Sequence, residues 1–383
     1  MILTAGVLLP KSVIYPTINF DIVAGLKAGL AQQGINEVNI KTENIGTAGD
    51  DKQIYAACEK MLMDGATLVA GYVNSSTAEK LSPLFKNGNA IFLCLDAGYH
   101  FPTSLKKPEN VFYISLLGAV CCRVITKVAT NYDVKKLAYT CSFYDSGYRS
   151  AYPFFNCLQE EGGTITFNHV TQLKRSDFTL EPLRNNLNEG DTKGVFAAFC
   201  GDMLQDLFNT AAQTGIFENT AIYGSSFVGE EDWLEQSPYP GNDIKVCVPW
   251  GRGLENPENE VFKNQLSLQK RKANIFSLLG WEAGTVMAAA FKAGDTDAAL
   301  HALEGLTYQS PRGAVYLNPD THQCYAPVYE GVVQKDETTG NCVLTITKES
   351  AWTEEQRQKY DQDLGNLPAH FTSWKNAYAC LEN

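Results

Sequence analysis

The sequence lacks the residue spacings that hold metal ions. Its eleven cysteines include no C-x-x-C pair, and no spacing between cysteines and the five histidines matches a zinc site. Eleven is an odd number, so at least one cysteine is unpaired within the chain. Most of them lie in apolar runs, where cysteine behaves as a small hydrophobic residue. We therefore expect neither a bound metal nor a cofactor.

Long hydrophobic runs and an excess of positive charge are missing too. No uncharged apolar run approaches the ~20 residues that span a bilayer, so we expect no direct membrane insertion. Lys and Arg number 31 against 43 Asp and Glu, which gives a formal net charge of −12. A surplus of negative charge opposes contact with phosphate backbones. Nucleic acid is therefore not an expected partner.

The first ten residues are apolar but too short for a signal segment with its flanks, and no small-residue cleavage site follows them. They predict a first strand. An exported protein whose signal segment is absent from this chain begins in this way, and so does a cytosolic one. The residues alone leave the location open.

The pattern that is present is an alternation of strands and helices, which favours α/β architecture with parallel sheets. With 383 residues the chain fits two lobes. The predicted strands are residues 3–9, 37–41, 68–72, 90–95, 136–141, 164–170, 194–199, 221–224 and 243–248, and the clearest predicted helices are 22–33, 55–63 and 276–291. Residues 111–115 are predicted to form a crossover. We expect lobe one to hold residues 1–117 and 250–325, and lobe two residues 118–249 and 326–383.

A hairpin is predicted late in the chain. Ser310 precedes Pro311 and is predicted to end a helix there, while Gly313 permits a tight turn. A second turn at residues 318–320 would deliver a strand over 325–333, rich in β-branched and aromatic residues. His322 falls in this turn, where exposure to solvent is expected. The charged segment from Trp352 onward is expected on the surface of lobe two.

Residues 310–322 resemble the SPxGxxxxxPxTH hairpin of the amino-acid and amide branch of type I periplasmic binding proteins. Four further segments resemble other elements of that branch, which includes leucine/isoleucine/valine-, amide- and urea-binding proteins. They are the serine-rich loop at 71–77, the D-x-x-Y-G loop at 142–148, the DFS-x-x-L element at 177–183 and the G-P-E turn at 223–226.

The resemblance implies two Rossmann-like lobes joined by three crossovers, with a ligand cleft between them. It also implies a binding protein that is not an enzyme, closes by a hinge motion around a small organic solute and passes it to the membrane permease of an ABC transporter. The solute would be amino-acid-like, an amide or an aromatic acid. A monomer that is periplasmic or lipid-anchored is expected on the same ground, with a cytoplasmic location as the alternative.

Candidate binding residues follow from the rule that ligands of doubly wound sheets gather at the carboxyl ends of the strands. Helix-capping Asn and Ser supply donors, tyrosines pair an apolar face with a hydroxyl, and acids receive an ammonium or hydroxyl. The plain alternatives are capping, solvated loop carboxylates and core packing. The candidates are Ser12, Tyr15, Asn74, Ser75, Ser76, Asp96, Ala97 and Tyr99 in lobe one, and Ser142, Tyr144, Tyr148, Cys200, Asp202, Ser226 and Trp250 after it.

One departure from the family pattern bears on the ligand. Relatives that carry α-amino acids have a glutamate in the turn where this chain has Ser226. Asp96 or Asp202 would have to replace it, or the ligand lacks an ammonium. Two other functions stay open: a cytosolic or receptor-type sensor of the same fold, and an α/β hydrolase-like enzyme, for which Cys200 with His100 is the candidate pair.

Overall fold

The computed structural model describes residues 3–99, 107–142, 145–172, 174–350 and 358; the side chains of 145–149 are not among the described parts. Contacts divide the chain into two compact units. Unit 1 comprises the described residues up to Leu116, Glu255–Pro327 and residue 358, and unit 2 comprises the described residues of Leu117–Leu254 and of 328–350. Up to Ser350, the chain therefore passes between the units three times. The segment from Trp352, apart from residue 358, lies outside the description.

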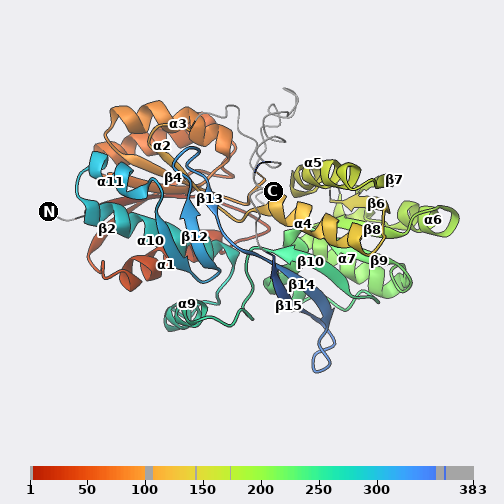
Figure 1. Ribbon diagram of the computed structural model, residues 1–383. Helices are drawn as coiled ribbons and strands as arrows, with labels where there is room; N and C mark the ends of the chain where they lie inside the picture. Colours follow the sequence, from red (N-terminus) through yellow and green to blue (C-terminus); the bar gives the residue numbers. More distant parts are fainter. Residues whose placement is uncertain (1–2, 100–106, 143–144, 173, 351–357, 359–383) are drawn as a thin grey trace. The chain divides into compact units, whose positions relative to one another are not determined.

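Unit 1 is built on a parallel five-stranded sheet in the order β2-β1-β3-β4-β5. Figure 1 shows α2 and α3 on one face of this sheet and α1 and α10 on the other. The elements are β1 (Leu3–Leu9), α1 (Ile18–Gln32), β2 (Val38–Asn44), α2 (Asp51–Met63), β3 (Leu68–Tyr72), α3 (Ser75–Asn87), β4 (Ile91–Asp96), β5 (Val111–Ser115), α9 (Pro257–Leu268), α10 (Ile275–Ala293) and α11 (Thr296–Leu303).

Two expectations about unit 1 need correction. Residues 111–115 form β5, a buried strand parallel to β4, and the passage to unit 2 follows it. No helix ends at Ser310, because residues 307–310 form a strand. The C-terminal hairpin sheet consists of β11 (Thr307–Ser310), β12 (Gly313–Leu317) and β13 (Cys324–Tyr325), paired antiparallel in that order.

The hairpin is tied to the main sheet at β5. The backbone N–H of Tyr113 donates to the carbonyl of His322. His322 itself is 2% exposed, stacks on Phe112 with ring centroids 4.0 Å apart, and contacts the Val111 carbonyl at 2.8 Å through Nδ1. The expectation that His322 is exposed is therefore wrong, because the turn packs against the edge of the sheet.

Helices α1 and α10 approach each other through glycines. A Cβ atom added to Gly25 would lie 2.0 Å from the backbone oxygen of Ser277, and one added to Gly284 would lie 2.3 Å from that of Leu26. Gly29 and Gly280 are equally crowded by the facing backbone. Small residues four positions apart let two helix backbones touch, so this seam admits no larger side chain.

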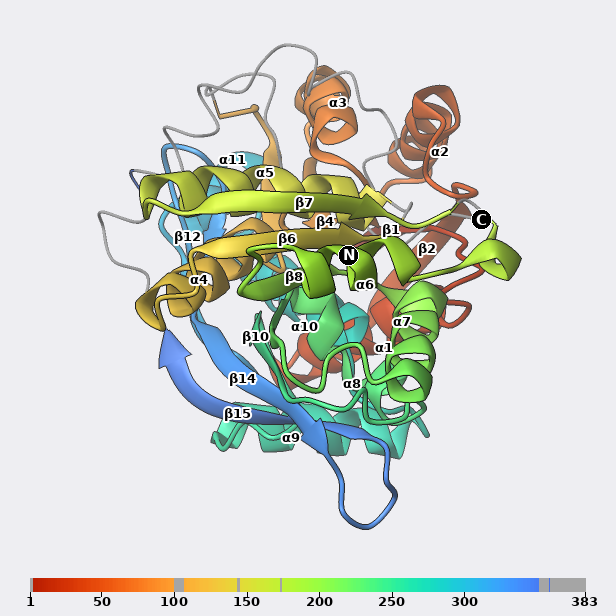
Figure 2. The same ribbon diagram turned by 90° about the vertical axis from the view of Figure 1, so that its right-hand side faces the viewer.

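Unit 2 contains a seven-stranded sheet in the order β15-β14-β10-β9-β8-β6-β7, in which β6 to β10 are parallel and β14 and β15 are antiparallel additions. Figure 2 shows α4 and α5 on one face and α7 on the other. The elements are α4 (Gly118–Asn131), β6 (Lys136–Cys141), α5 (Asp145–Glu160), β7 (Thr164–Val170), α6 (Glu181–Glu189), β8 (Gly194–Ala198), α7 (Gly201–Thr214), β9 (Ala221–Gly224), α8 (Glu231–Leu234), β10 (Ile244–Val248), β14 (Val328–Lys335) and β15 (Cys342–Ser350).

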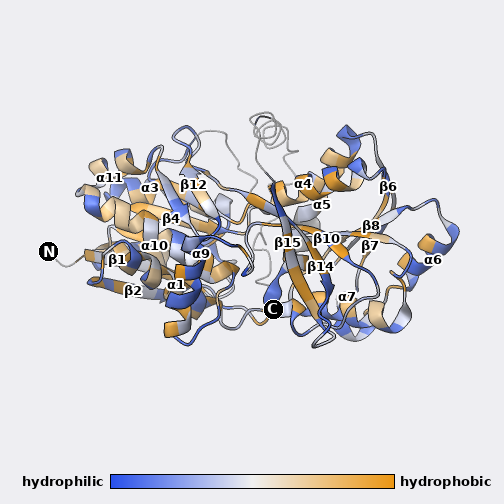
Figure 3. Cartoon of the chain, turned by 60° about the horizontal axis from the view of Figure 1, so that its bottom comes forward, coloured by the Kyte–Doolittle hydropathy of each residue, from blue (hydrophilic) through white to orange (hydrophobic). Residues whose placement is uncertain are grey.

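The core of each unit lies along its central strands. Strands β3, β4, β5 and β8 are buried at every residue, and Figure 3 shows hydrophobic colour concentrated on such strands while α6 and α9 carry many hydrophilic residues. Burial on both faces is what a parallel sheet covered by helices requires. The ten described cysteines are all buried within these cores.

Candidate functional site

The loops at the carboxyl ends of β1 and β3 hold an aromatic cluster in unit 1. Tyr15 is 7% exposed and meets the ring of Phe276 edge-on, with centroids 4.9 Å apart. Phe276 also meets Tyr72, the last residue of β3, at 5.8 Å. The backbone N–H of Tyr15 donates to Ser12 Oγ at 3.0 Å, which shapes the loop. The three rings form an apolar surface at this edge of the sheet.

Asp21 fixes the start of α10, and with it the position of Phe276. This carboxylate is 4% exposed and accepts from Arg271 Nη1 at 2.9 Å and from Asn274 Nδ2 at 3.1 Å. Asn274 caps α10 by accepting from the backbone N–H groups of Phe276 and Ser277. Since Asp21 belongs to the first turn of α1, the two helices begin at the same edge.

Helix α3 begins at this edge, with Asn74 as its cap. Asn74 Oδ1 accepts from the Thr77 backbone N–H at 2.9 Å and from Ser76 Oγ at 2.7 Å, so capping is confirmed as one of its roles. The Ser75 hydroxyl makes no hydrogen bond to another residue in the described ranges, and Ser75 is 7% exposed. It stands where the helix dipole is positive, which suits an anionic or carbonyl oxygen.

Residues after β4 are more enclosed than a solvated loop would be. Asp96 is 9% exposed and its Oδ1 accepts from the Gly98 backbone N–H at 2.5 Å. Tyr99 is 3% exposed and Ala97 6%. The reading of Asp96 as a solvated carboxylate is therefore wrong, and the carboxylate holds a tight turn. His100 falls outside the described residues.

In unit 2 the predicted residues again lie at or after the carboxyl ends of strands, but the carboxylate of Asp202 is already paired with an arginine. Asp202 pairs with Arg175 Nη1 at 3.0 Å, and the same guanidinium binds Asp206 through Nε at 2.7 Å. Its charge is thus balanced within the protein. Ser142, Cys200, Ser226 and Trp250 are all buried; Tyr144 lies outside the described residues, and Tyr148 is placed only as a position in α5.

Sequence reasoning missed two contributors to these edges. Phe276 was read only as part of an apolar core helix, and its place at the first turn of α10 is the signal that was available. His169 was weighed only as a metal ligand, although it stands one residue before the end of β7. Within the described ranges, no group of three His, Cys, Asp or Glu side chains is arranged to hold a metal ion.

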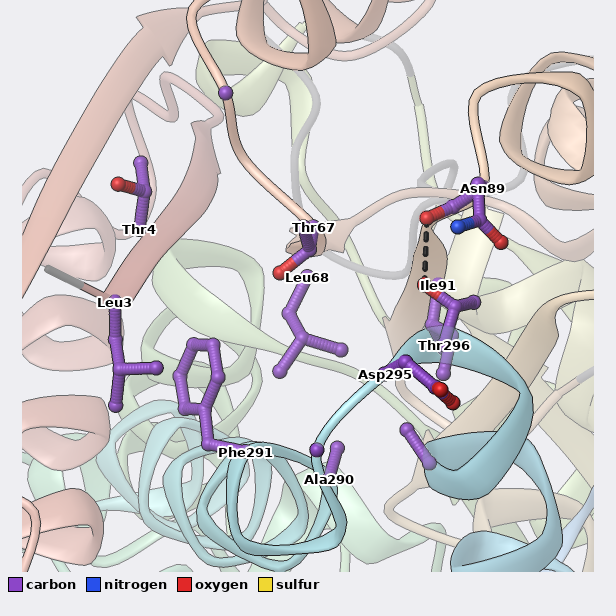
Figure 4. Close-up of a pocket in the computed structure, with 13 residues that line it drawn as sticks. Leu3, Thr4, Thr67, Leu68, Asn89, Ile91, Ala290, Phe291, Asp295 and Thr296 are labelled. Atoms are coloured by element: carbon purple, nitrogen blue, oxygen red, sulfur yellow. Dashed lines mark hydrogen bonds between the residues drawn. The ribbon is translucent and has the colours of Figure 1, made fainter. Parts of the chain in front are cut away.

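A pocket of about 250 Å³ lies in unit 1 at the opposite edge of the sheet (Figure 4). It is lined by Leu3 and Leu68, at the amino ends of β1 and β3, and by Phe291 near the end of α10. Thr296 Oγ1 donates to the Asn89 carbonyl at 2.6 Å at its rim. Because ligands of such sheets gather at the carboxyl ends, this pocket is not the candidate site.

The family model described as periplasmic binding protein matches residues 3–338. This chain is a type I periplasmic binding protein. Among curated relatives, the "Leu/Ile/Val-binding protein homolog 6" of Brucella suis biovar 1 (strain 1330) is 22% identical over 350 residues, covering 87% of this chain and 88% of the relative.

Solved structures of other solute-binding proteins share the fold. An ABC-transporter solute-binding protein of R. palustris, in complex with 4-hydroxybenzoate, has a TM-score of 0.74 at 17% identity and covers 91% of this chain and 97% of its own. A leucine-, isoleucine-, valine-, threonine- and alanine-binding protein of Brucella ovis has a TM-score of 0.73 at 14% identity, with coverages of 92% and 95%.

Membership in the periplasmic binding protein family sets the coarse function. The chain is a solute-binding protein of the kind that serves ABC transporters, and it binds a small ligand. Members of the family are binding proteins and not enzymes, and the family implies an extracytoplasmic location. Among the described residues, no helix is long and apolar enough to cross a membrane.

Proposed function

We propose that this periplasmic binding protein captures a small organic acid or amide with a hydrocarbon or ring body. The observation that carries the proposal is the start of α3 next to the aromatic cluster of Tyr15, Tyr72 and Phe276. Ser75 and the positive end of the helix offer donors to an oxygen anion or carbonyl, while the rings offer an apolar surface.

An α-ammonium is not required of the ligand. Ser226 occupies the turn in which amino-acid-binding relatives are expected to have an acid, and Asp202 is already paired with Arg175. Asp96 is bonded to its own turn through Gly98. Solved structures with this fold include a complex with 4-hydroxybenzoate and a leucine-, isoleucine-, valine-, threonine- and alanine-binding protein, so an aromatic acid is within the range of the fold.

The remaining predicted residues are proposed as further contacts from the carboxyl ends of both units, brought to the ligand by hinge closure. They are Ser12, Ala97, Tyr99, Ser142, Tyr144, Tyr148, Cys200 and Trp250. We propose further that the protein is a monomer, periplasmic or lipid-anchored, and delivers its solute to an ABC permease.

A thermal-shift panel of aliphatic amino acids, amides, urea and aromatic acids tests the ligand class. A compound at about 100 times its dissociation constant adds roughly 2.7 kcal/mol to the free energy of unfolding. The double variant Ser75→Ala with Ser76→Ala should lose most of the shift. Ser82→Ala is the matched control, because Ser82 lies on the same helix and donates to the Glu109 carbonyl instead. Stabilisation by α-amino acids alone, undiminished in the double variant, would contradict the proposal.

A further inference from the structure

Three buried polar atoms without hydrogen-bond partners belong to residues at or just past the carboxyl ends of two neighbouring strands of unit 2. They are Ser142 Oγ, one residue after β6, and His169 Nε2 and Gln172 Oε1, on and just after β7; none has a partner among the described residues. Ser142 is 0% exposed and His169 is 5% exposed. A buried polar atom left unsatisfied costs about 1–3 kcal/mol. Atoms left in this state indicate a missing partner group.

The pairing of β6 with β7 brings Ser142 and His169 close together. Strands β6 and β7 are neighbours, with Thr140 opposite His169 and Cys141 opposite Val170. Pairing continues beyond the strand ends, since the backbone N–H of Thr171 donates to the Cys141 carbonyl at 3.0 Å. From the rise along a strand and the spacing between strands, the Cα atoms of Ser142 and His169 are roughly 8 Å apart.

Alternation places both side chains on one face. Thr140 Oγ1 contacts His169 Nδ1 at 2.9 Å, so these two share a face of the sheet. Ser142 is two residues beyond Thr140 and therefore projects to the same face. The contact with Thr140 holds the imidazole by Nδ1 and leaves Nε2 for another partner. This corner lies at the carboxyl edge of the sheet, where a solute would arrive.

The chemistry of the corner is neutral. Burial lowers the pKa of His169, so its ring is uncharged near pH 7 and offers at Nε2 one donor or one acceptor. The Ser142 hydroxyl can donate and accept. A hydroxyl, which both donates and accepts, matches the set.

We propose that Ser142 and His169 form a specificity-determining subsite for an uncharged hydroxyl group of the solute. The inference rests on the proposed function and adds a second polar group to the ligand, besides its acid or carbonyl. Solutes that carry this hydroxyl are selected over matched solutes that lack it, because without it the buried atoms stay unsatisfied.

Calorimetric titration of the full chain with three matched pairs tests this: benzoate and 4-hydroxybenzoate, valine and threonine, phenylalanine and tyrosine. In the pair that the protein binds, the hydroxylated member should bind about tenfold more tightly. Ser142→Ala and His169→Phe should each reduce that ratio to about threefold or less. His169→Gln, which keeps an amide near the Nε2 position, should restore part of the preference.

Ser237→Ala is the matched control, because Ser237 is buried in the same unit but donates to the Trp233 carbonyl at 2.8 Å. It should keep the full ratio. Removing the unpartnered Ser142 hydroxyl should leave the melting temperature of the ligand-free protein unchanged or raise it. A lower melting temperature with an intact ratio would show that the hydroxyl only holds buried water, and it would overturn the inference.

The two proposals fail in different ways. A wild-type protein that binds members of the pairs with ratios near one refutes the hydroxyl subsite and leaves the proposed function standing. A wild-type protein that binds none of the six compounds, and none of the amides or acids of the thermal-shift panel, refutes both.

Discussion

Glu282 and Arg312 form an ion pair with no exposure to solvent on either side chain. Arg312 donates through Nε to Glu282 Oε1 and through Nη2 to Oε2, each at 2.7 Å, and Ser310 Oγ donates to Oε1 at 2.6 Å. The pair joins α10 to the turn between β11 and β12. It therefore anchors the C-terminal hairpin inside unit 1.

Removing one partner of this pair should be costly. Glu282→Gln leaves a buried guanidinium without its counter-charge and should lower the free energy of unfolding by about 3–5 kcal/mol. Urea unfolding followed by circular dichroism measures the change. The pair Lys263 and Glu260, whose side chains are 30% and 59% exposed, is the comparison, and Lys263→Ala should alter the midpoint little. Equal effects of the two substitutions would refute the anchoring role.

The glycine seam between α1 and α10 should tolerate no added carbon. Gly284→Ala places a Cβ against the backbone of Leu26, so the helices must separate, at a cost of about 3 kcal/mol or more. Gly49→Ala is the control, since the nearest atom to its Cβ would be the Thr47 hydroxyl at 3.8 Å. Thermal melts of both variants test the prediction, and a Gly284 variant as stable as the control would contradict it.

Acidification should destabilise the protein through buried histidines. Burial lowers the pKa of His322 and of His169 below the ordinary value of 6.5. Below pH 6.5 the unfolded chain binds protons at these histidines more readily than the folded chain does. The contribution of the neutral histidines to the free energy of unfolding is therefore complete above pH 6.5 and is lost as the pH falls below it.

Groups that face His322 act in the same region. Its Nε2 is 3.3 Å from Glu304, which also binds Lys107. These partners lower the pKa of Glu304, so its contribution is lost only at pH values below the ordinary 4.5. Melting temperatures between pH 7 and pH 5 therefore respond to the histidines and not to Glu304. His322→Asn should flatten the slope in that range, and an unchanged slope in this variant would show that His322 does not contribute.

The thiols should be inert in the folded protein. All ten cysteines within the described residues are buried, and burial raises the pKa of Cys58 and of Cys141 to about 12. The thiolate is the reactive form, so Ellman's reagent at pH 8 should react promptly with at most one thiol. Denaturant should release all eleven. Prompt reaction of several thiols in the native protein would show that the cores open readily.

The strands of both units could be predicted closely, because buried parallel strands are short apolar runs. Residues 3–9, 68–72, 136–141, 164–170 and 221–224 were predicted with the bounds that the structure has. β5 was mistaken for a crossover because the chain passes to unit 2 directly after it. β11 was mistaken for the end of a helix because Pro311 also suits the turn between two strands.

The candidate site was harder to predict from the sequence. The strand ends in the sequence show at which edge of the sheet a residue lies. They do not show which polar side chains are already paired with other residues of the protein. Asp202 is paired with Arg175, 27 positions away, and Glu282 with Arg312, 30 positions away; neither spacing carries a local signal. The binding roles of the named residues, and lobe boundaries at residues 117, 249 and 325, stay predictions.

The glycine seam also bears on the order in which the protein folds as it leaves the ribosome. All five strands of the main sheet of unit 1 have emerged by Ser115, but α10, which covers one face and docks on α1 through backbone contact, begins only at Ile275. The five parallel strands of unit 2 emerge in between. Unit 1 must therefore wait with one sheet face covered by α1 but not yet by α10 while most of unit 2 is synthesised, and a chaperone that shields apolar surface would act on this interval.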